Sequence, residues 1–184
     1  MNIKLLLLFF LSFHASYSQV SLNADSLRGS LRTERTCFDV TYYDLHVRIN
    51  PENKFISGFN KIFFTAKEAS DQIQIDLFKQ YQINNITIQV PLDKDGDMFE
   101  HFTLKYSRTE NAVIVDLPNE LEIGLKYILK ISYSGKPNVA KRAPWDGGFV
   151  WGKDSLKRDF VGVACEGHGA SSWWPCKDHL SCLL

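Results

Sequence analysis

The chain has 184 residues, with 21 basic and 21 acidic side chains and a hydrophobic share of 45%. This length is enough for one domain with a real core, since domains usually contain about 100 to 150 residues. The balanced charge and the lack of a basic block argue against nucleic acid as a ligand. Four cysteines are too few for a disulfide-built scaffold, although an oxidising compartment would permit a bridge, whose pairing stays open. They are Cys37, Cys165, Cys176 and Cys182.

The first 18 residues have the composition of a secretory signal peptide. Lys4 is followed by an apolar run over residues 5–13, and small residues at 15, 16 and 18 complete the order of charged, apolar and cleavage regions. The run is about half as long as the roughly 20 residues that a membrane-spanning helix needs. We therefore expect residues 1–18 to be removed, no transmembrane span after cleavage, and a chain exported to the periplasm, the outer surface or the medium.

Residues 19–37 are polar and mixed, which predicts a flexible lead-in. From Val40 onward apolar and polar residues alternate with a period of two, the pattern of strands with one buried face. No stretch of a dozen residues keeps apolar positions at helical spacing, so the fold class is all-β, as a sandwich or an open twisted sheet. Strands are predicted at residues 40–49, 55–65, 72–77, 86–90, 102–106, 113–117 and 125–133.

Two of these strands show the alternation clearly. In the first, one side is apolar and is predicted to be buried; it consists of Leu45, Val47 and Ile49. In the third, Ile73, Ile75 and Leu77 are predicted to face the core. The polar residues between them are predicted to face solvent; they are Gln72, Gln74 and Asp76.

Past Pro137 the composition changes to glycine, tryptophan and proline, and we expect the function to lie there. Tryptophan faces stack on sugar rings, so these residues could form a glycan platform. They also fill cores and interfaces, which is the commoner use. The residues concerned are Trp145, Trp151, Trp173 and Trp174.

Two patterns resemble metal sites. Cys165, His168, Cys176 and His179 have the spacing C-x2-H-x7-C-x2-H, and sulfur with imidazole is a ligand set for tetrahedral zinc. The connector is shorter than the dozen or so residues usual between ligand pairs, which favours buried or bridged cysteines beside solvated histidines. Residues 93–97 carry carboxylates suited to calcium. Their glycine stands fourth, not sixth as in an EF-hand loop, which favours a solvated hairpin turn.

Residues 163–178, V-A-C-E-G-H-G-A-S-S-W-W-P-C-K-D, resemble the end of the amino-terminal domain in enzymes of the aminopeptidase N family, in the form found in exported bacterial members. Y-D-L-H-V at residues 43–47 and F-I-S-G at residues 55–58 are similar to the opening hairpin of that domain. The Cys-Glu and Trp-Pro-Cys-x-Asp pieces are the specific parts. The resemblance implies a saddle-like antiparallel β domain over residues 38–181, of the kind that packs on a thermolysin-like catalytic domain.

The same resemblance implies that Glu166 binds the free α-amine of the substrate. A carboxylate in a partly closed cleft pairs well with an ammonium group, which would select free amino termini over internal peptides. Pro175 and Asp178 match the family pattern, and we expect structural roles for both. Ser171 departs from it, because many relatives carry arginine there, and this puts in doubt the anion contact usual at that place.

The catalytic chemistry of the family lies in a different domain. There, the two histidines of an H-E-x-x-H helix and a later glutamate hold zinc, and the glutamate inside the motif activates the attacking water. H-E-x-x-H does not occur in these 184 residues, so we expect neither a catalytic residue nor bound zinc in this part. Residues 182–184 stand where relatives continue, and we expect them to be an aberrant tail of a truncated product or broken gene model.

The resulting hypothesis is a fragment of a zinc-dependent aminopeptidase that supplies the β domain and the amine anchor, and is inactive alone. Its partner would be the amino terminus of a peptide substrate. It also predicts a bare apolar surface around residues 149–174, where a catalytic domain would dock. The alternative is a stand-alone exported β-sandwich module whose tryptophans line one exposed face and bind a glycan or a protein.

Overall fold

The computed structural model describes residues 27, 29–92, 98–143 and 145–179. The predicted signal peptide, the acidic segment 93–97 and the predicted tail 182–184 lie outside the described residues. None of the helices within the described ranges is long and apolar enough to cross a membrane.

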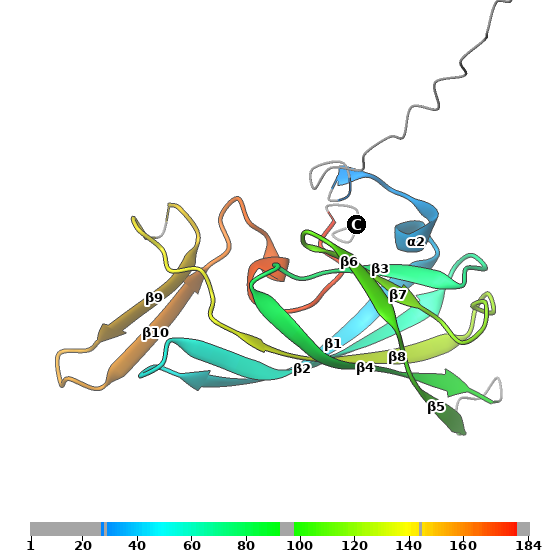
Figure 1. The fold of residues 1–184 in the computed structure, drawn as a ribbon, viewed down its shortest axis with the longest axis horizontal. Helices are drawn as coiled ribbons and strands as arrows, with labels where there is room; N and C mark the ends of the chain where they lie inside the picture. The colour runs from blue at the N-terminus through cyan, green and yellow to red at the C-terminus, as the bar shows by residue number, and fades with distance from the viewer. Residues whose placement is uncertain (1–26, 28, 93–97, 144, 180–184) are drawn as a thin grey trace, which may run out of the picture.

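The fold is all-β and antiparallel, as predicted (Figure 1). A five-stranded sheet has the order β1 (Phe38–Asn50), β2 (Phe55–Ala66), β8 (Lys126–Gly135), β4 (Tyr81–Pro91) and β5 (Phe99–Thr103). A three-stranded sheet has the order β3 (Gln72–Asp76), β7 (Ala112–Asp116) and β6 (Tyr106–Thr109). A separate hairpin pairs β9 (Gly148–Lys153) with β10 (Asp159–Ala164). The helical pieces are α2 (Thr33–Thr36) and the 3-10 turn η1 (Ala170–Ser172).

The core lies between the two larger sheets. The three-stranded sheet covers one face of the twisted five-stranded sheet, with the β9–β10 hairpin at one end of the molecule and α2 at the other (Figure 1). Leu129 of β8 is paired with Ile62 of β2 on one side and with Ile88 of β4 on the other. Ile73 and Ile75 of β3 belong to the same buried cluster. Alternating apolar residues thus hold the sheets together by removing apolar surface from water.

The third predicted strand is buried on both faces, and the prediction of a solvated polar face is wrong. Gln74 and Asp76 are as buried as their apolar neighbours Ile73 and Ile75. The reason is tertiary: Arg35 of α2 bonds to Asp76, and the backbone of Asp76 pairs with that of Cys176. Chain segments from both ends of the domain therefore cover the face that the alternation assigned to water.

Three further details differ from the sequence predictions. The segment predicted as one strand at 102–106 is divided between β5 and β6, which belong to different sheets. The hairpin of β9 and β10 was not predicted, because its glycines interrupt the alternation. Ile49 is 43% exposed, since it lies near the free end of β1 at the edge of the sheet, whereas Leu45 and Val47 are half-buried.

Two buried tyrosines in contact offer a matched test of hydrogen bonding in the core. Tyr81 and Tyr133 pack edge to face with ring centroids 5.8 Å apart, and burial raises the pKa of both. The Tyr81 hydroxyl donates to the Ser172 carbonyl at 3.0 Å, whereas the buried Tyr133 hydroxyl has no hydrogen-bond partner among the described residues.

We expect Tyr81→Phe to lower the free energy of unfolding by about 1 to 2 kcal/mol, because Ser172 loses its donor. Tyr133→Phe should leave the free energy of unfolding unchanged or raise it by up to about 1 kcal/mol, because it removes a buried hydroxyl without a partner. Urea unfolding of both variants measures the difference. Equal destabilisation by the two changes would contradict the assignment.

Candidate functional site

Glu166 lies in the turn that joins β10 to η1, the orange loop in Figure 1. The Cys165 carbonyl closes this turn by accepting the N–H groups of His168 at 3.0 Å and Gly169 at 2.9 Å. The Glu166 side chain is exposed, and its carboxylate makes no hydrogen bond or ion pair with any other described residue. The structure therefore presents a single acidic group on a closed turn.

The Glu166 turn rests directly against the segment that precedes β9. A Cβ at Gly147 would lie 2.7 Å from His168 Nδ1 and 2.8 Å from the Glu166 carbonyl oxygen. The backbone φ of Gly147 is +62°, which also favours glycine. This close approach explains why glycine stands at 147, and it fixes the distance between the Glu166 turn and the neighbouring loop.

A buried ion pair supports the segment that follows the turn. Arg35 Nη2 lies 2.7 Å from Asp76 Oδ1, and the Arg35 side chain is fully buried. Gln74 Nε2 donates to the same Asp76 oxygen at 3.1 Å. Both Arg35 and Gln74 also donate to the Leu27 carbonyl. Burial raises the pKa of Asp76 to about 6, because the loss of hydration outweighs the opposing effect of Arg35.

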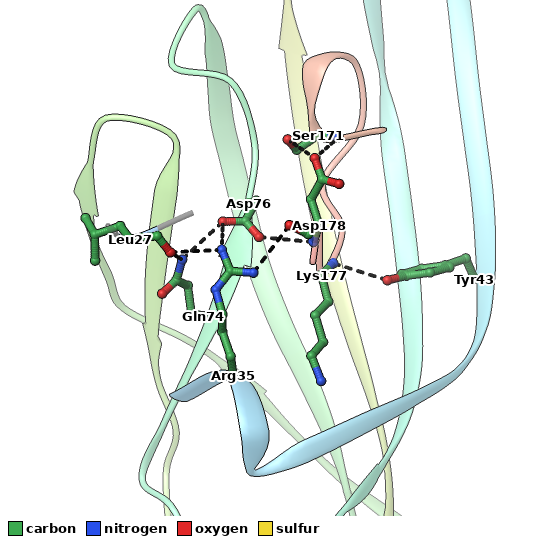
Figure 2. A network of polar contacts seen from close by, with 8 residues as sticks. All are labelled: Leu27, Arg35, Tyr43, Gln74, Asp76, Ser171, Lys177 and Asp178. Carbon is green, nitrogen blue, oxygen red and sulfur yellow. Dashed lines mark hydrogen bonds and ion pairs between the residues drawn. The ribbon is translucent and has the colours of Figure 1, made fainter. Parts of the chain in front are cut away.

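Asp178 connects this ion pair to η1, as Figure 2 shows. Its N–H donates to Asp76 Oδ2 at 3.1 Å, and its carbonyl accepts from Arg35 Nη1 at 3.4 Å. Its carboxylate turns toward Ser171, from which Oδ2 accepts the backbone N–H at 3.2 Å and the hydroxyl at 2.6 Å. The contacts give Asp178 the structural role predicted for it, and they give the buried Ser171 hydroxyl a partner within the domain.

Residues 175–177, which follow η1, are hydrogen-bonded to the five-stranded sheet. The Pro175 carbonyl accepts from Nδ2 of the fully buried Asn60 at 2.8 Å, which supports the structural role predicted for Pro175. The Lys177 N–H donates to the Tyr43 hydroxyl at 3.1 Å, and Lys177 Nζ donates to the Phe38 carbonyl at 2.7 Å. The segment that carries the candidate site is thus anchored to β1 and β2.

The four tryptophans do not form one exposed face. Trp151 stacks on Phe149 at a centroid distance of 5.3 Å, and Trp173 meets Phe149 edge to face. Trp174 packs edge to face on Tyr43 at 4.9 Å. Trp145 is 80% exposed and makes none of these contacts. Three of the four therefore act mainly in packing.

The predicted bare apolar surface is present only in part. Phe149 is buried beneath Trp151, so its predicted exposure is wrong. Exposed large apolar side chains of this region are Leu156 in the turn between β9 and β10, at 70%, and Phe160 and Val163 of β10, at 55% and 41%. The last two lie on the strand that leads into the Glu166 turn.

The described residues do not fit a metal site. Among them, no group of three or more histidine, cysteine or acidic side chains could hold a metal ion. This includes the set weighed above as a zinc candidate, Cys165, His168, Cys176 and His179. Cys37, Cys165 and Cys176 form no disulfide with one another, and Cys182 lies outside the described ranges. The calcium candidate at residues 93–97 also lies outside them.

Surface hollows occur elsewhere on the domain. One, of about 560 Å³, is lined by the β1–β2 hairpin around His46 and Phe59. Another, of about 230 Å³, lies between Lys54 and the β9–β10 hairpin, where Trp151 and Phe160 line it. Glu166 lines neither of these two hollows.

The Arg35–Asp76 ion pair could not be predicted from the sequence. Arg35 falls within the polar range 19–37 that was predicted as a flexible lead-in, where an arginine is expected in solvent. Asp76 occupies the polar side of an alternating strand, which is also typical of solvated residues. Only the pairing of distant segments reveals that the two side chains are buried together.

Comparisons with known proteins agree with this fold. Residues 39–181 match the family model of the peptidase M1 N-terminal domain. No curated protein sequence matches the chain significantly.

Solved structures with a similar fold include an M1 zinc metallopeptidase from Deinococcus radiodurans, in a mutant form bound to a Tyr-Ser-Ala substrate. It is 23% identical, with a TM-score of 0.53, over 77% of this chain and 29% of that one. Leukotriene A4 hydrolase from Saccharomyces cerevisiae is 17% identical, with a TM-score of 0.54, over 78% of this chain and 21% of that one. The chain thus spans less than a third of the length of these proteins, and at this identity the likeness shows the fold alone.

Proposed function

The chain belongs to the family of peptidase M1 N-terminal domains, and from this we propose that it is the β domain of a zinc-dependent aminopeptidase and that Glu166 anchors the substrate's α-amine. The M1 family is zinc-dependent. H-E-x-x-H does not occur in these 184 residues, and we place zinc and the water-activating glutamate in a catalytic domain. The role of this chain is to bind and orient the amino terminus of a peptide. We further propose that the protein works outside the cytoplasm, as the composition of residues 1–18 suggests.

The observation that carries the proposal is the exposed carboxylate of Glu166 on a closed turn. A carboxylate without an internal partner can take an ammonium group as its counter-ion. In the exposed position this pairing is weak, because water screens both charges. When a second domain covers the turn, the lower local dielectric strengthens it. A substrate with a free amino terminus would gain this interaction, and an internal peptide would not.

Two further observations support a docked domain and a peptide substrate. Phe160 and Val163 expose apolar surface on β10, directly before the Glu166 turn. Burial of such surface favours association with another domain. In addition, the similar structure from Deinococcus radiodurans holds a Tyr-Ser-Ala substrate. The docking surface would thus include the strand that leads into the amine anchor.

We expect Glu166→Gln in the complete gene product to lower kcat/KM for aminoacyl substrates by about 10 to 100 fold, mainly through KM, because a charge-assisted bond to the amine is lost. Asp159→Asn is the matched control. It removes an exposed carboxylate of the same hairpin that already pairs with Lys153, and it should change kcat/KM by less than about 2 fold. The chain of residues 19–184 alone should not hydrolyse an aminoacyl chromogenic substrate, with or without added zinc.

Three outcomes would contradict the proposal. The first is an unchanged kcat/KM in Glu166→Gln, and the second is zinc-dependent turnover by the chain of residues 19–184. The third is a gene that encodes no H-E-x-x-H segment in any frame beyond codon 184.

The alternative of a glycan-binding module has less support. It requires tryptophans on one exposed face, whereas Trp151, Trp173 and Trp174 pack against Phe149, against Tyr43 and against each other. Binding of the chain to a glycan panel, lost in Trp145→Ala, would favour this alternative. We expect no such binding.

A further inference from the structure

The Glu166 turn is supported from several sides: the His168 ring packs on Phe78 at a centroid distance of 5.7 Å, and the turn rests against Gly147. Its internal bonds are those from the His168 and Gly169 N–H groups to the Cys165 carbonyl. Before the turn, β10 pairs only with β9, in a hairpin that is separate from the two larger sheets. The segment that follows the turn, Gly169 and η1, is one of these supports, since Ser172 Oγ of η1 donates to the Gly169 carbonyl at 2.7 Å.

Asp178 holds that segment from within the domain. Its Oδ2 atom accepts two hydrogen bonds from Ser171, at 2.6 Å from the hydroxyl and 3.2 Å from the N–H. Ser171 is 2% exposed, so water cannot replace these bonds. The same carboxylate lies against Gly169, where an added Cβ would be 2.2 Å from Oδ2. One side chain thus contacts Gly169, which links the Glu166 turn to η1, and Ser171 within η1.

Asp178 is itself fixed by the buried ion pair (Figure 2). Asp76 accepts its N–H, and Arg35 donates to its carbonyl. Arg35 and Asp76 cannot move apart without leaving a buried charge unpaired, which is strongly unfavourable. The network therefore runs from α2 through β3 and Asp178 to η1, and it ends at the Glu166 turn.

We infer that Asp178 is a positioning residue for Glu166: it holds the turn of residues 165–169 at a fixed distance from the β-sheet core. The Arg35–Asp76 pair supports it. The statement that this positioning presents the Glu166 carboxylate to a substrate amine rests on the proposed function. The positioning itself does not, and it can be measured in the chain without a catalytic domain.

The experiment is amide hydrogen exchange by NMR on the 184-residue chain. The probes are the His168 and Gly169 N–H groups, which close the turn on the Cys165 carbonyl. In Asp178→Ala we expect both to exchange about 10 to 100 fold faster, because two buried hydrogen bonds to Ser171 are lost. Amides of β2 and β8 should change by less than about 2 fold under conditions of local opening. Asp178→Asn keeps an acceptor oxygen and should restore slow exchange to within about 3 fold of the wild type.

Asp154→Ala is the matched control. Asp154 also accepts two backbone N–H groups with one oxygen, from Leu156 and Arg158, but in the turn between β9 and β10. Its replacement should speed exchange at those two residues and leave His168 and Gly169 unchanged. If Asp178→Ala does not fold, Ser171→Ala removes only the hydroxyl bond, and we expect it to speed exchange at the turn by about 3 to 10 fold.

Three results would overturn the inference. These are unprotected His168 and Gly169 amides in the wild type, unchanged exchange in both Asp178→Ala and Ser171→Ala, and acceleration that matches that of the core amides. The proposed function is judged separately, by the activity of Glu166→Gln. That variant should leave exchange in the turn unaltered, so a fixed turn with no effect of Glu166→Gln on kinetics would refute the amine anchor alone.

Discussion

Arg35→Met should lower the free energy of unfolding by about 3 to 5 kcal/mol, among the largest effects expected of any single change in this domain. Methionine keeps most of the apolar stem but removes the charge, so Asp76 is left buried without its ionic partner. The carbonyls of Leu27 and Asp178 lose a donor as well. Urea unfolding, with an unchanged slope, measures this loss.

The pH dependence of this effect has a definite sign. Removal of Arg35 raises the folded pKa of Asp76 further above about 6, while the unfolded value stays near 4. A carboxyl whose pKa is raised by folding loses stability as pH rises through that window, because the folded state binds the extra proton. The deficit of Arg35→Met relative to the wild type should therefore be smaller at about pH 5 than at about pH 8.

Two controls make this expectation specific. Lys79→Ala removes a cation from an exposed pair with Glu110 and should cost less than about 1 kcal/mol. The double variant Arg35→Met with Asp76→Leu replaces both charges by apolar groups and should be more stable than Arg35→Met alone. A single variant as stable as Lys79→Ala, or a deficit that does not grow with pH, would show that Asp76 is not the group left unpaired.

Gly169→Ala should lower the free energy of unfolding by about 3 kcal/mol or more, because two costs add. The backbone of Gly169 has φ of +77° and ψ of 175°, a conformation adopted almost only by glycine. In addition, the new Cβ would lie 2.2 Å from Asp178 Oδ2, so the carboxylate must leave Ser171.

Gly124→Ala separates the two costs. Gly124 also has a positive φ, of +87°, but an added Cβ there meets no atom within 4 Å. We expect this control to cost about 1 kcal/mol, from backbone strain alone. Equal losses in the two variants, measured by urea unfolding, would show that the Asp178 carboxylate moves aside without cost.

Much of the fold could be predicted from the sequence because burial and alternation coincide in the long strands. β8 alternates apolar and polar residues along most of its length, and the structure buries its alternating set of Tyr127, Leu129, Ile131 and Tyr133. The failures share a cause. Gln74 and Asp76 follow the same alternation but are covered by chain from both ends of the domain. The local sequence pattern does not indicate that distant chain segments cover these residues.

One residue of the candidate site could be predicted from the sequence, but the residues that support it could not. Resemblance to a family pointed to Glu166, and the structure places it exposed on a closed turn. The residues that support the turn, Arg35 and Asp76, carry no such signal, because their pairing joins positions 41 residues apart. Local patterns predict local elements, whereas the position of the Glu166 turn is determined by contacts between distant segments.

The position of β8 between β2 and β4 has a consequence for how the chain folds as it leaves the ribosome. β8 spans residues 126–135 and pairs with β2 on the side away from β1 and with β4 on the side away from β5. Until those residues emerge, β2 and β4 each lack a neighbouring strand on one side. The backbone N–H and C=O groups along those two edges then have no inter-strand hydrogen bonds. The largest sheet is therefore completed in one late step that joins residues about 70 positions apart, such as Ile62 and Leu129. Synthesis halted before that step would leave both edges open to other molecules.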